Sequence, residues 1–435
     1  MGTDRYVALG LARVRAAWFT DVARWATSGS LAMDFVKTVS TDEVRARLES
    51  GRPFSALLID GGVPGIDRDL LELARERGCA VLVVADESGR DWRSVGAATT
   101  LPTDFDRSAL ESALDEFAVP IGVADELPGE PHQHVPEPGF RARTVAVTGP
   151  GGTGRSLVAS AIAQGMAADV AHADTVVLAD LALHADQAML HDARDVIPGV
   201  LELVEGHRSG APSPDEVRSL TFDIVARRYR LLLGLRRHRD WTALRPRALH
   251  AALDGLRRAF TLVIADVDDD LEGEAVTGSA DIEDRNLLSR TAIDLADVVV
   301  VVGNGGTKGV HSLLRVVRDC LAAGVGGERL VIVVNRAPKR GPVRAETSRT
   351  INELLVASHP GETVLSPIFV PERRNLDQIL RDVAPLPGAV VDPVTAAVRS
   401  RLDAVDTAER APSVLDEPVP VEPGSLGEWD EEIAG

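Results

Sequence analysis

The chain has 435 residues, which is too long for one ordinary hydrophobic core and suggests two or three domains. Its formal net charge of -19 argues against adhesion of the whole protein to nucleic acid or anionic lipid through its general field. The sequence has no N-terminal export signal and no apolar run of about 18 or more residues. We therefore expect a cytoplasmic protein without a transmembrane segment, for which nucleic acid is not the main partner.

The first 122 residues alternate apolar strand-like pieces with amphipathic helical ones. The strand-like pieces are "RYVALGL", "MDFVKTVS", "SALLIDGG" and "AVLVVAD", and "TDEVRARLES" and "DRDLLELARERG" lie between them. Buried parallel strands read as continuous apolar runs, so this alternation predicts a small doubly wound α/β domain over residues 1–122.

The stretch "LLIDGGVPGID" resembles the phosphoacceptor strand end of response-regulator receivers, with Asp60 at the acceptor position. A receiver also needs an acidic pair after its first strand to hold Mg²⁺, and "ALGLARVR" offers none. The lysine expected after the last strand is absent too, with Thr103 near that place. The resemblance therefore implies a flavodoxin-like pseudo-receiver, in which Asp60 is a plain strand-end carboxylate.

Composition marks three further segments. Residues 123–141 are rich in Pro, Gly and Glu and are read as a linker. A second, larger α/β domain is expected over residues 142–405. Residues 406–435 are acidic, rich in Pro and poor in packing residues, so we expect a disordered tail.

The second domain opens with "RTVAVTGPGGTGRSLVASAIAQGMA", which reads as a strand, a glycine-rich turn and the start of a helix. Such a turn presents consecutive backbone N–H groups and the positive end of a helix dipole, which together hold a polyphosphate. Residues 149–156 match G-x-x-x-x-G-K-[ST] except for Arg155. The Ser156 hydroxyl is a candidate Mg²⁺ ligand, and Asp266, which ends the strand in "TLVIADVDDD", is a candidate for holding the metal's water shell.

These motifs, in this order, resemble the deviant Walker A ATPases of the MinD/ParA type, and more closely the CpaE-like and septum site-determining branch with an N-terminal receiver-like domain. Supporting matches are "VVLADLALHAD", with Asp180 at the first acidic position of the switch, "LVIVVNR" at the adenine, and "IFVPERRNLDQIL" as a loop beside the base. The resemblance implies a three-layer P-loop domain that binds ATP or ADP with Mg²⁺ and forms a nucleotide-dependent homodimer. The implied nucleotide-binding residues are Gly149, Gly151, Gly152, Thr153, Gly154, Arg155, Ser156, Leu157, Asn335 and Arg336.

Three departures from the family pattern bear on catalysis. Pro150 replaces the lysine that reaches across the family's dimer, Arg155 replaces the second lysine, and Ala182 replaces the switch aspartate that orients water. Positioning and charge stabilisation supply most of phosphoryl-transfer catalysis, so we expect little or no hydrolysis. Asp180 and Asp266 remain as candidate catalytic carboxylates.

The resemblance implies a role in spatial organisation, with protein partners in septum or Flp-type pilus machinery. An active ATPase of the same family and a DNA-associated partitioning regulator are the alternatives. The arginine-rich segment 227–258 is interpreted either as a patch for nucleic acid or an acidic partner, or as solvated helix faces. The acidic run after Asp266 is interpreted as a solvated loop or, alternatively, as ligands for a divalent metal.

Overall fold

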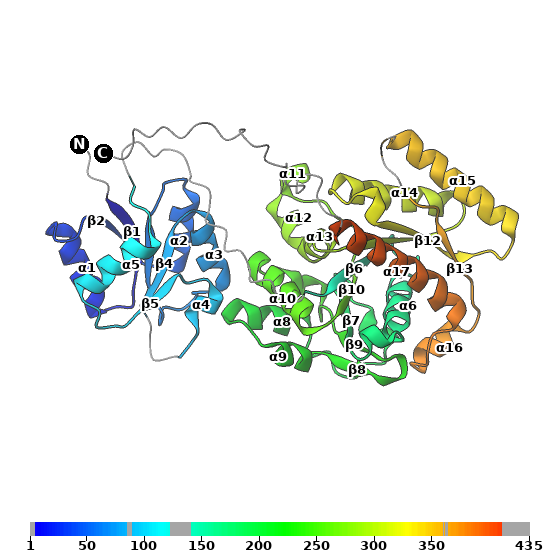
Figure 1. Ribbon diagram of the computed structural model, residues 1–435, viewed down its shortest axis with the longest axis horizontal. Coiled ribbons are helices and arrows are strands. Elements are labelled where there is room, and N and C mark those ends of the chain that lie inside the picture. The colour runs from blue at the N-terminus through cyan, green and yellow to red at the C-terminus, as the bar shows by residue number, and fades with distance from the viewer. Residues whose placement is uncertain (1–4, 85–88, 122–140, 360, 362–363, 411–435) are drawn as a thin grey trace, which may run out of the picture.

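A computed structural model of the chain describes residues 5–84, 89–121, 141–359, 361 and 364–410, which form two α/β domains (Figure 1). The linker expected at 123–141 lies almost wholly outside the described residues. The expected tail lies outside them beyond Arg410, where the last helix ends. Among the described helices, none combines the length and the apolar composition that a membrane span requires.

The first domain is a parallel five-stranded sheet with the strand order β2-β1-β3-β4-β5. Its strands are β1 (Tyr6–Leu11), β2 (Met33–Thr38), β3 (Ala56–Asp60), β4 (Ala80–Val84) and β5 (Thr99–Leu101). Its helices are α1 (Ala17–Thr27), α2 (Thr41–Glu49), α3 (Arg68–Glu76), α4 (Trp92–Val95) and α5 (Arg107–Phe117). The apolar residues of α2, α3 and α4 pack on one face of the sheet, and those of α1 and α5 pack on the other. This is the flavodoxin-like strand order, with each strand buried by helices on both sides.

The second domain is built on an eight-stranded sheet with the order β13-β12-β11-β6-β10-β7-β9-β8. Its strands are β6 (Arg143–Thr148), β7 (Val176–Asp180), β8 (Phe222–Ile224), β9 (Tyr229–Leu232), β10 (Leu262–Asp266), β11 (Val298–Asn304), β12 (Leu330–Ala337) and β13 (Ile368–Pro371). Only the edge strand β8 pairs antiparallel among these strands. The carboxyl ends of β6, β7, β10, β11 and β12 therefore meet at one edge, where ligands bind in open parallel sheets.

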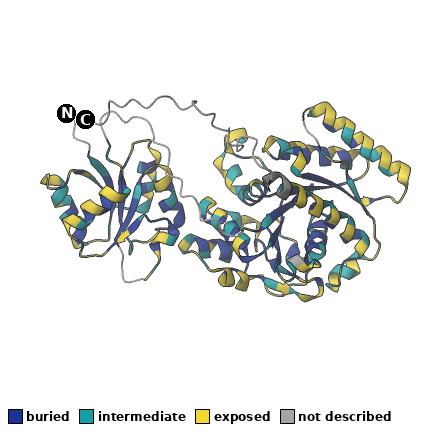
Figure 2. Ribbon diagram, in the orientation of Figure 1, coloured by how far each residue is buried: buried dark blue, intermediate teal, exposed yellow. Residues whose placement is uncertain are grey.

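Two layers of helices cover this sheet. The helices α6 (Arg155–Ala167) and α17 (Gly388–Arg410) pack on one face. The other face carries α8 (Val200–Ser209), α10 (Pro246–Ala259), α13 (Leu287–Asp294), α14 (Thr307–Ala322) and α15 (Gly341–Ser358). Figure 2 shows the strands buried and the outer helix faces exposed, most of all along α15. The expected three-layer α/β architecture, preceded by a smaller flavodoxin-like domain, is confirmed.

Short elements complete the second domain and lie mostly in the connections between the long helices and strands. The helical ones are α7 (Gln187–Leu190), α9 (Pro214–Ser219), α11 (Glu274–Thr277), α12 (Ala280–Arg285) and α16 (Leu376–Arg381). The 3-10 turns are η1 (Val170–His172), η2 (Val225–Arg227), η3 (His238–Ala243) and η4 (Gly327–Arg329).

The two domains are held together by charged residues of α3 that meet α8 and α10. The Arg68 side chain donates to the carbonyl oxygens of His207 (2.8 Å) and Gly210 (2.9 Å), which lie at the C-terminal end of α8. A cation is favourable at that end of a helix, because the last carbonyl groups have no intrahelical partner. Arg247 at the start of α10 forms an ion pair with Glu76.

Breaking this contact should let the domains move apart. We expect the double variant Arg68→Ala/Arg247→Glu to increase the radius of gyration by a few ångströms, roughly as expected for two domains that have lost their interface. The measurement is small-angle X-ray scattering on the full chain. The matched control is Arg75→Ala/Arg349→Glu, in which both positions are exposed. A scattering profile that is identical in the wild type and both variants would contradict the proposed role of the contact.

Candidate nucleotide site

The glycine-rich turn lies between β6 and α6, as the sequence predicts. Three of its glycines are required by the path of the backbone. A Cβ atom at Gly149 would lie 2.1 Å from the carbonyl oxygen of Val302, and Gly152 and Gly154 have φ of 77° and 87° in the left-handed region. Gly151 and Gly152 face open space. The turn therefore leaves its outer side free for a ligand next to the N-terminus of a 13-residue helix.

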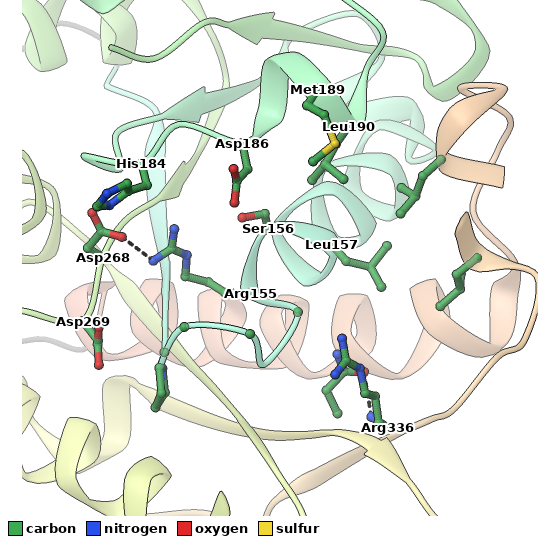
Figure 3. A pocket seen from close by; sticks show the side chains of 18 of the residues that line it. Arg155, Ser156, Leu157, His184, Asp186, Met189, Leu190, Asp268, Asp269 and Arg336 are labelled. Carbon is green, nitrogen blue, oxygen red and sulfur yellow. Dashed lines mark hydrogen bonds and ion pairs between the residues drawn. The ribbon is translucent and has the colours of Figure 1, made fainter. Parts of the chain in front are cut away.

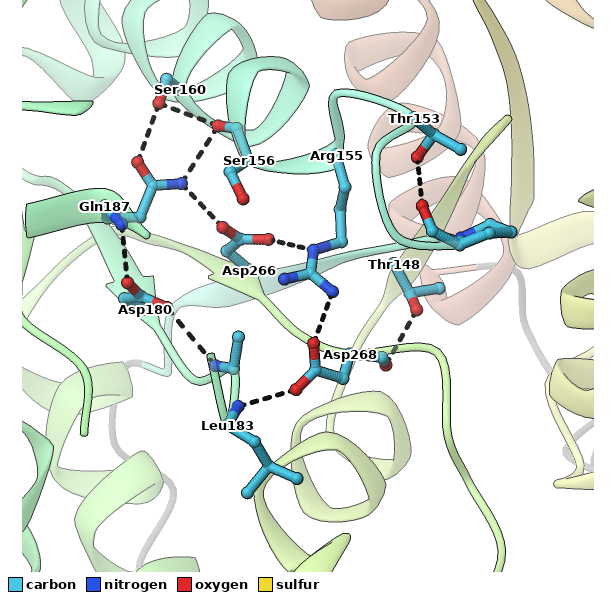
Figure 4. Close-up of polar contacts among 12 residues, drawn as sticks. Thr148, Thr153, Arg155, Ser156, Ser160, Asp180, Leu183, Gln187, Asp266 and Asp268 are labelled. Carbon is cyan, nitrogen blue, oxygen red and sulfur yellow. Dashed lines mark hydrogen bonds and ion pairs between the residues drawn. The ribbon is translucent and has the colours of Figure 1, made fainter. Parts of the chain in front are cut away.

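The side chain of Arg155 lies over two carboxylates rather than in open solvent (Figure 4). Its Nε donates to Asp266 at 2.7 Å, its Nη1 donates to Asp268 at 2.8 Å, and it is 11% exposed. Burial disfavours the charged form, but attraction by Asp266 and Asp268 outweighs it and raises the pKa of the Arg155 guanidinium. Arg155 is therefore a cation that is held at the strand ends by ion pairs with two carboxylates.

Asp266 has neither carboxylate oxygen free. Its Oδ1 accepts from Arg155, and its Oδ2 accepts from the amide of Gln187 at 2.8 Å. The same amide nitrogen donates to the carbonyl oxygen of Ser156 at 3.0 Å. A divalent metal or its water shell needs these oxygens as acceptors. The residues present do not fit Mg²⁺, because a guanidinium and an amide already occupy the carboxylate.

Asp180, the other candidate catalytic carboxylate, is turned toward the backbone. It accepts from the N–H groups of Gln187 (2.9 Å) and Ala182 (3.4 Å), and it is fully buried. Burial, followed by repulsion from Asp266, raises the pKa of Asp180 well above its ordinary value. The methyl group of Ala182 is buried too and offers no hydrogen bond to water.

A chain of buried polar side chains runs from this site into the domain. His191 contacts the Gln187 carbonyl oxygen through Nδ1 at 2.8 Å, and its Nε2 lies 2.6 Å from the Tyr229 hydroxyl and 3.2 Å from Nη1 of Arg227. Burial lowers the pKa of His191 to about 4. His191 is therefore neutral at pH 7, and with Nδ1 protonated its Nε2 lone pair is the acceptor that faces both the Tyr229 hydroxyl and Arg227.

A cavity of about 840 Å³ lies in front of the turn (Figure 3). Six of its lining residues are acidic and four are arginines. The acidic residues are Asp186, Asp268, Asp269, Asp270, Glu372 and Asp377, and the arginines are Arg155, Arg285, Arg336 and Arg373. Ser156 and Leu157 also line it. The side chains of Arg336 and Arg373 make no ion pair with any residue the structure describes, so they remain available to an anion.

Asn335 lies at the end of β12, next to the turn, but its amide is engaged. Its Nδ2 donates to the Thr153 carbonyl oxygen at 2.8 Å, and its Oδ1 accepts from the Arg336 N–H at 2.9 Å. Asn335 therefore supports the turn from the side. The structure thus brings all ten predicted nucleotide-binding residues to one place, and their role in binding stays a prediction.

The acidic run after Asp266 begins with paired aspartates, and its later carboxylates Glu272, Glu274, Asp281 and Asp284 are exposed. Each of its three consecutive aspartates pairs with an arginine of a different helix. The pairs are Asp268 with Arg155, Asp269 with Arg315, and Asp270 with Arg285. No group of three or more candidate metal ligands occurs among the described residues.

The arginines of segment 227–258 lie in different surroundings. Arg227 is buried, Arg230 donates to Thr221, and Arg247 lies at the contact with the first domain. The interpretation of the segment as solvated helix faces is wrong for Arg227. The exposed arginines are Arg228, Arg236, Arg237, Arg239, Arg245 and Arg258, and a patch for nucleic acid or an acidic partner stays an untested interpretation.

In the first domain, Arg13 occupies the place next to Asp60. Its Nε donates to both carboxylate oxygens, at 3.0 and 3.2 Å, and the Gly62 N–H donates at 2.9 Å. A Cβ atom at position 62 would lie 2.4 Å from the Arg13 guanidinium carbon, so Gly62 makes room for the arginine. The sequence signal was present, because Arg13 stands where the receiver pattern needs acids. In the second domain, no feature of the sequence pointed to Gln187 as a residue of the site.

No protein-family model matches the chain, and its sequence matches no curated protein. Among solved structures it is similar to a ParA family ATPase from Chlorobium tepidum TLS, at 12% identity and a TM-score of 0.47, over 59% of this chain and 98% of that chain. It is also similar to the cell division ATPase MinD of Pyrococcus furiosus, at 15% identity and a TM-score of 0.44, over 60% of this chain and 99% of that chain. A third similar structure is the septum site-determining protein MinD of Pyrococcus horikoshii OT3 complexed with Mg-ADP. Its sequence identity is 14% and its TM-score is 0.42, over 62% of this chain and 96% of that chain.

The lowered pKa of His191 predicts a pH dependence of stability. The unfolded chain binds a proton at this residue below about pH 6.5, whereas the folded protein resists protonation until about pH 4, so stability contributed by neutral His191 is lost as pH falls. Between pH 7 and pH 5 this loss is about 2 kcal/mol. We expect His191→Gln to remove this part of the pH dependence of the unfolding free energy, measured by urea unfolding at several pH values. The control His250→Gln, at an exposed position, should keep the wild-type slope. Parallel slopes for the wild type and His191→Gln would contradict this assignment.

The Arg13–Asp60 pair predicts that the first domain does not accept phosphate. The guanidinium already occupies both carboxylate oxygens, and a phosphoryl group there would lack a metal to stabilise its charge. Incubation with acetyl phosphate and Mg²⁺, followed by intact mass measurement, should show no adduct. A stoichiometric adduct that disappears in Asp60→Asn would overturn this prediction.

Proposed function

We propose that the second domain is a MinD/ParA-type P-loop domain, of the CpaE-like and septum site-determining branch, that has lost efficient hydrolysis. The protein acts as a nucleotide-responsive switch or a scaffold in spatial organisation, such as septum placement or Flp-type pilus assembly. The single observation that carries the loss of hydrolysis is the position of Arg155, which forms ion pairs with Asp266 and Asp268.

Three features support a retained nucleotide site. The turn from Gly149 to Gly154 keeps an open outer side, the N-terminus of α6 faces it, and Arg336 lies free at the cavity wall. Backbone N–H groups at a helix start bind phosphate without any lysine. We therefore propose ADP or ATP as the ligand, held by the turn and Arg336 and without a tightly bound Mg²⁺.

The alternative of an active ATPase is not favoured by the site. Catalysis of phosphoryl transfer needs a metal, a positioned water and a positively charged group that is free to approach the leaving phosphate. Both carboxylate oxygens of Asp266 already accept a hydrogen bond, Asp180 is turned to the backbone, and Ala182 offers no group for water. Pro150 likewise lacks the cation that the family's dimer contributes, so a nucleotide-dependent homodimer would need other contacts.

The first domain is proposed as a pseudo-receiver that is permanently docked on α8 and α10. Its Asp60 is neutralised by Arg13, and the turn that follows leads directly into α3, the helix that carries the domain contact. We propose that the protein acts in the cytoplasm and that its protein partners belong to cell-envelope machinery such as a septum or a Flp-type pilus.

ADP binding should depend little on Mg²⁺. We expect calorimetric titration of the full chain to give affinities that differ by less than about threefold with and without Mg²⁺, because Asp266 has no free oxygen for the metal's water shell. The variant Arg336→Glu should weaken ADP binding about tenfold through charge repulsion, whereas Arg349→Glu on the exposed face of α15 should not. An affinity that rises by orders of magnitude on adding Mg²⁺ would show that Arg155 leaves its carboxylates when nucleotide binds.

ATP hydrolysis should be negligible, and Arg155→Lys alone should not restore it. Groups that act as a unit are not additive, so repairing one leaves the others limiting. The triple variant Pro150→Lys/Arg155→Lys/Ala182→Asp is expected to turn over measurably in a phosphate-release assay. Wild-type turnover that is lost in Ser156→Ala or Asp266→Ala would contradict the proposed function.

A further inference from the structure

A second cavity, of about 600 Å³, lies at the C-terminal end of α6, away from the glycine-rich turn at its N-terminal end. Its walls come from three parts of the chain. These are the end of α6 with Gln164, the turn 226–228 between β8 and β9, and residues 385–399, which include the first half of α17. Gln164 fixes one wall, because its side chain both donates to and accepts from the backbone of Leu386.

Arg227 lines this cavity and is a buried charge without a counter-charge. It is 1% exposed, and it forms no ion pair with any acidic residue of the described chain. Its Nε donates to the Ala384 carbonyl oxygen at 3.1 Å, and its Nη1 lies 3.2 Å from Nε2 of His191. Its Nη2 is buried and has no hydrogen-bond partner within the part of the chain that the structure describes. A buried cation of this kind is costly unless an anion and further hydrogen bonds compensate for it.

The planar guanidinium group fixes the direction of the unpartnered nitrogen. In arginine, the Nε–H group and Nη2 lie along one edge of the plane, which is the edge that binds carboxylate or phosphate in a two-point contact. Because Nε donates to Ala384, this edge faces the segment that continues as Pro385 and Leu386 in the cavity wall. The unpartnered donor is thus on the edge next to Ala384, whose chain continues into the cavity wall, and the His191 contact is made by the other terminal nitrogen.

The charges around the cavity match an anion. Arg228 and Arg399 line it together with Arg227, and Asp392 is the one carboxylate among the described lining residues. Arg228 is exposed and forms no ion pair with the described acids. Arg399 is partly balanced by Asp169 at 3.1 Å.

We propose that this second cavity binds a small oxyanion, a phosphate or a carboxylate group, with Arg227 as its buried anchor and Arg228 at its entrance. The site is separate from the proposed nucleotide site and does not depend on it. Through His191 and Gln187, Arg227 adjoins the chain of buried hydrogen bonds that ends at Asp266.

The test is calorimetric titration of the full chain with inorganic phosphate and, separately, with acetate, at constant ionic strength. We expect the wild type to bind at least one of the two ions, and the ion that binds identifies the group the site prefers. Arg228→Glu reverses a charge at an exposed position, so it should leave the fold intact and weaken binding about tenfold. Arg227→Gln should abolish binding, and Arg228→Glu keeps the test valid if that buried variant does not fold.

Two controls locate the site. Arg336→Glu makes the same charge change in the cavity of the glycine-rich turn, and Arg349→Glu makes it on α15. Arg349→Glu should bind the ion as the wild type does, and Arg336→Glu should keep the binding event that Arg228→Glu weakens. Phosphate binding that is lost in Arg336→Glu and kept in Arg228→Glu would place the ion at the glycine-rich turn and overturn the proposal. Absence of binding of both ions to the wild type would overturn it as well.

Discussion

The ion pairs of Arg155 with Asp266 and Asp268 are the interaction on which the candidate site depends. Three carboxylates, Asp180, Asp266 and Asp268, come together where parallel strands end, and two of them are almost fully buried. Such a cluster is unstable without a nearby cation. A planar guanidinium supplies that charge and hydrogen-bonds two of the carboxylates from different nitrogen atoms of one rigid group.

The first domain also has an arginine beside its strand-end carboxylate. Arg13 stands beside Asp60 where a receiver would hold a metal, and Gly62 leaves the space that the arginine needs. In both domains a side chain of the protein itself thus balances the strand-end carboxylate. A fixed cation preserves the fold of such a site while removing the exchangeable ion on which phosphoryl transfer depends. This supports our proposal that the protein is a switch or a scaffold.

The sequence predicted the two α/β domains and the place of the glycine-rich turn, because buried parallel strands and turn glycines leave strong local patterns. It also identified Arg155 as the unusual residue of the turn. It could not predict where that side chain points, because its second partner, Asp268, follows β10 more than a hundred residues later. Gln187 and the burial of Arg227 were missed for the same reason. Their contacts are formed between elements that are distant in the chain, and neither residue type indicates burial.

The most direct measurement is a crystal structure of the full chain grown with ADP and Mn²⁺, with data collected at the manganese absorption edge. We expect Arg155 to stay within hydrogen-bond distance of Asp266 and Asp268, and we expect no anomalous peak between Ser156 and Asp266. A manganese peak at that position, with Arg155 displaced toward the nucleotide phosphates, would contradict the claim that the arginine has replaced the metal.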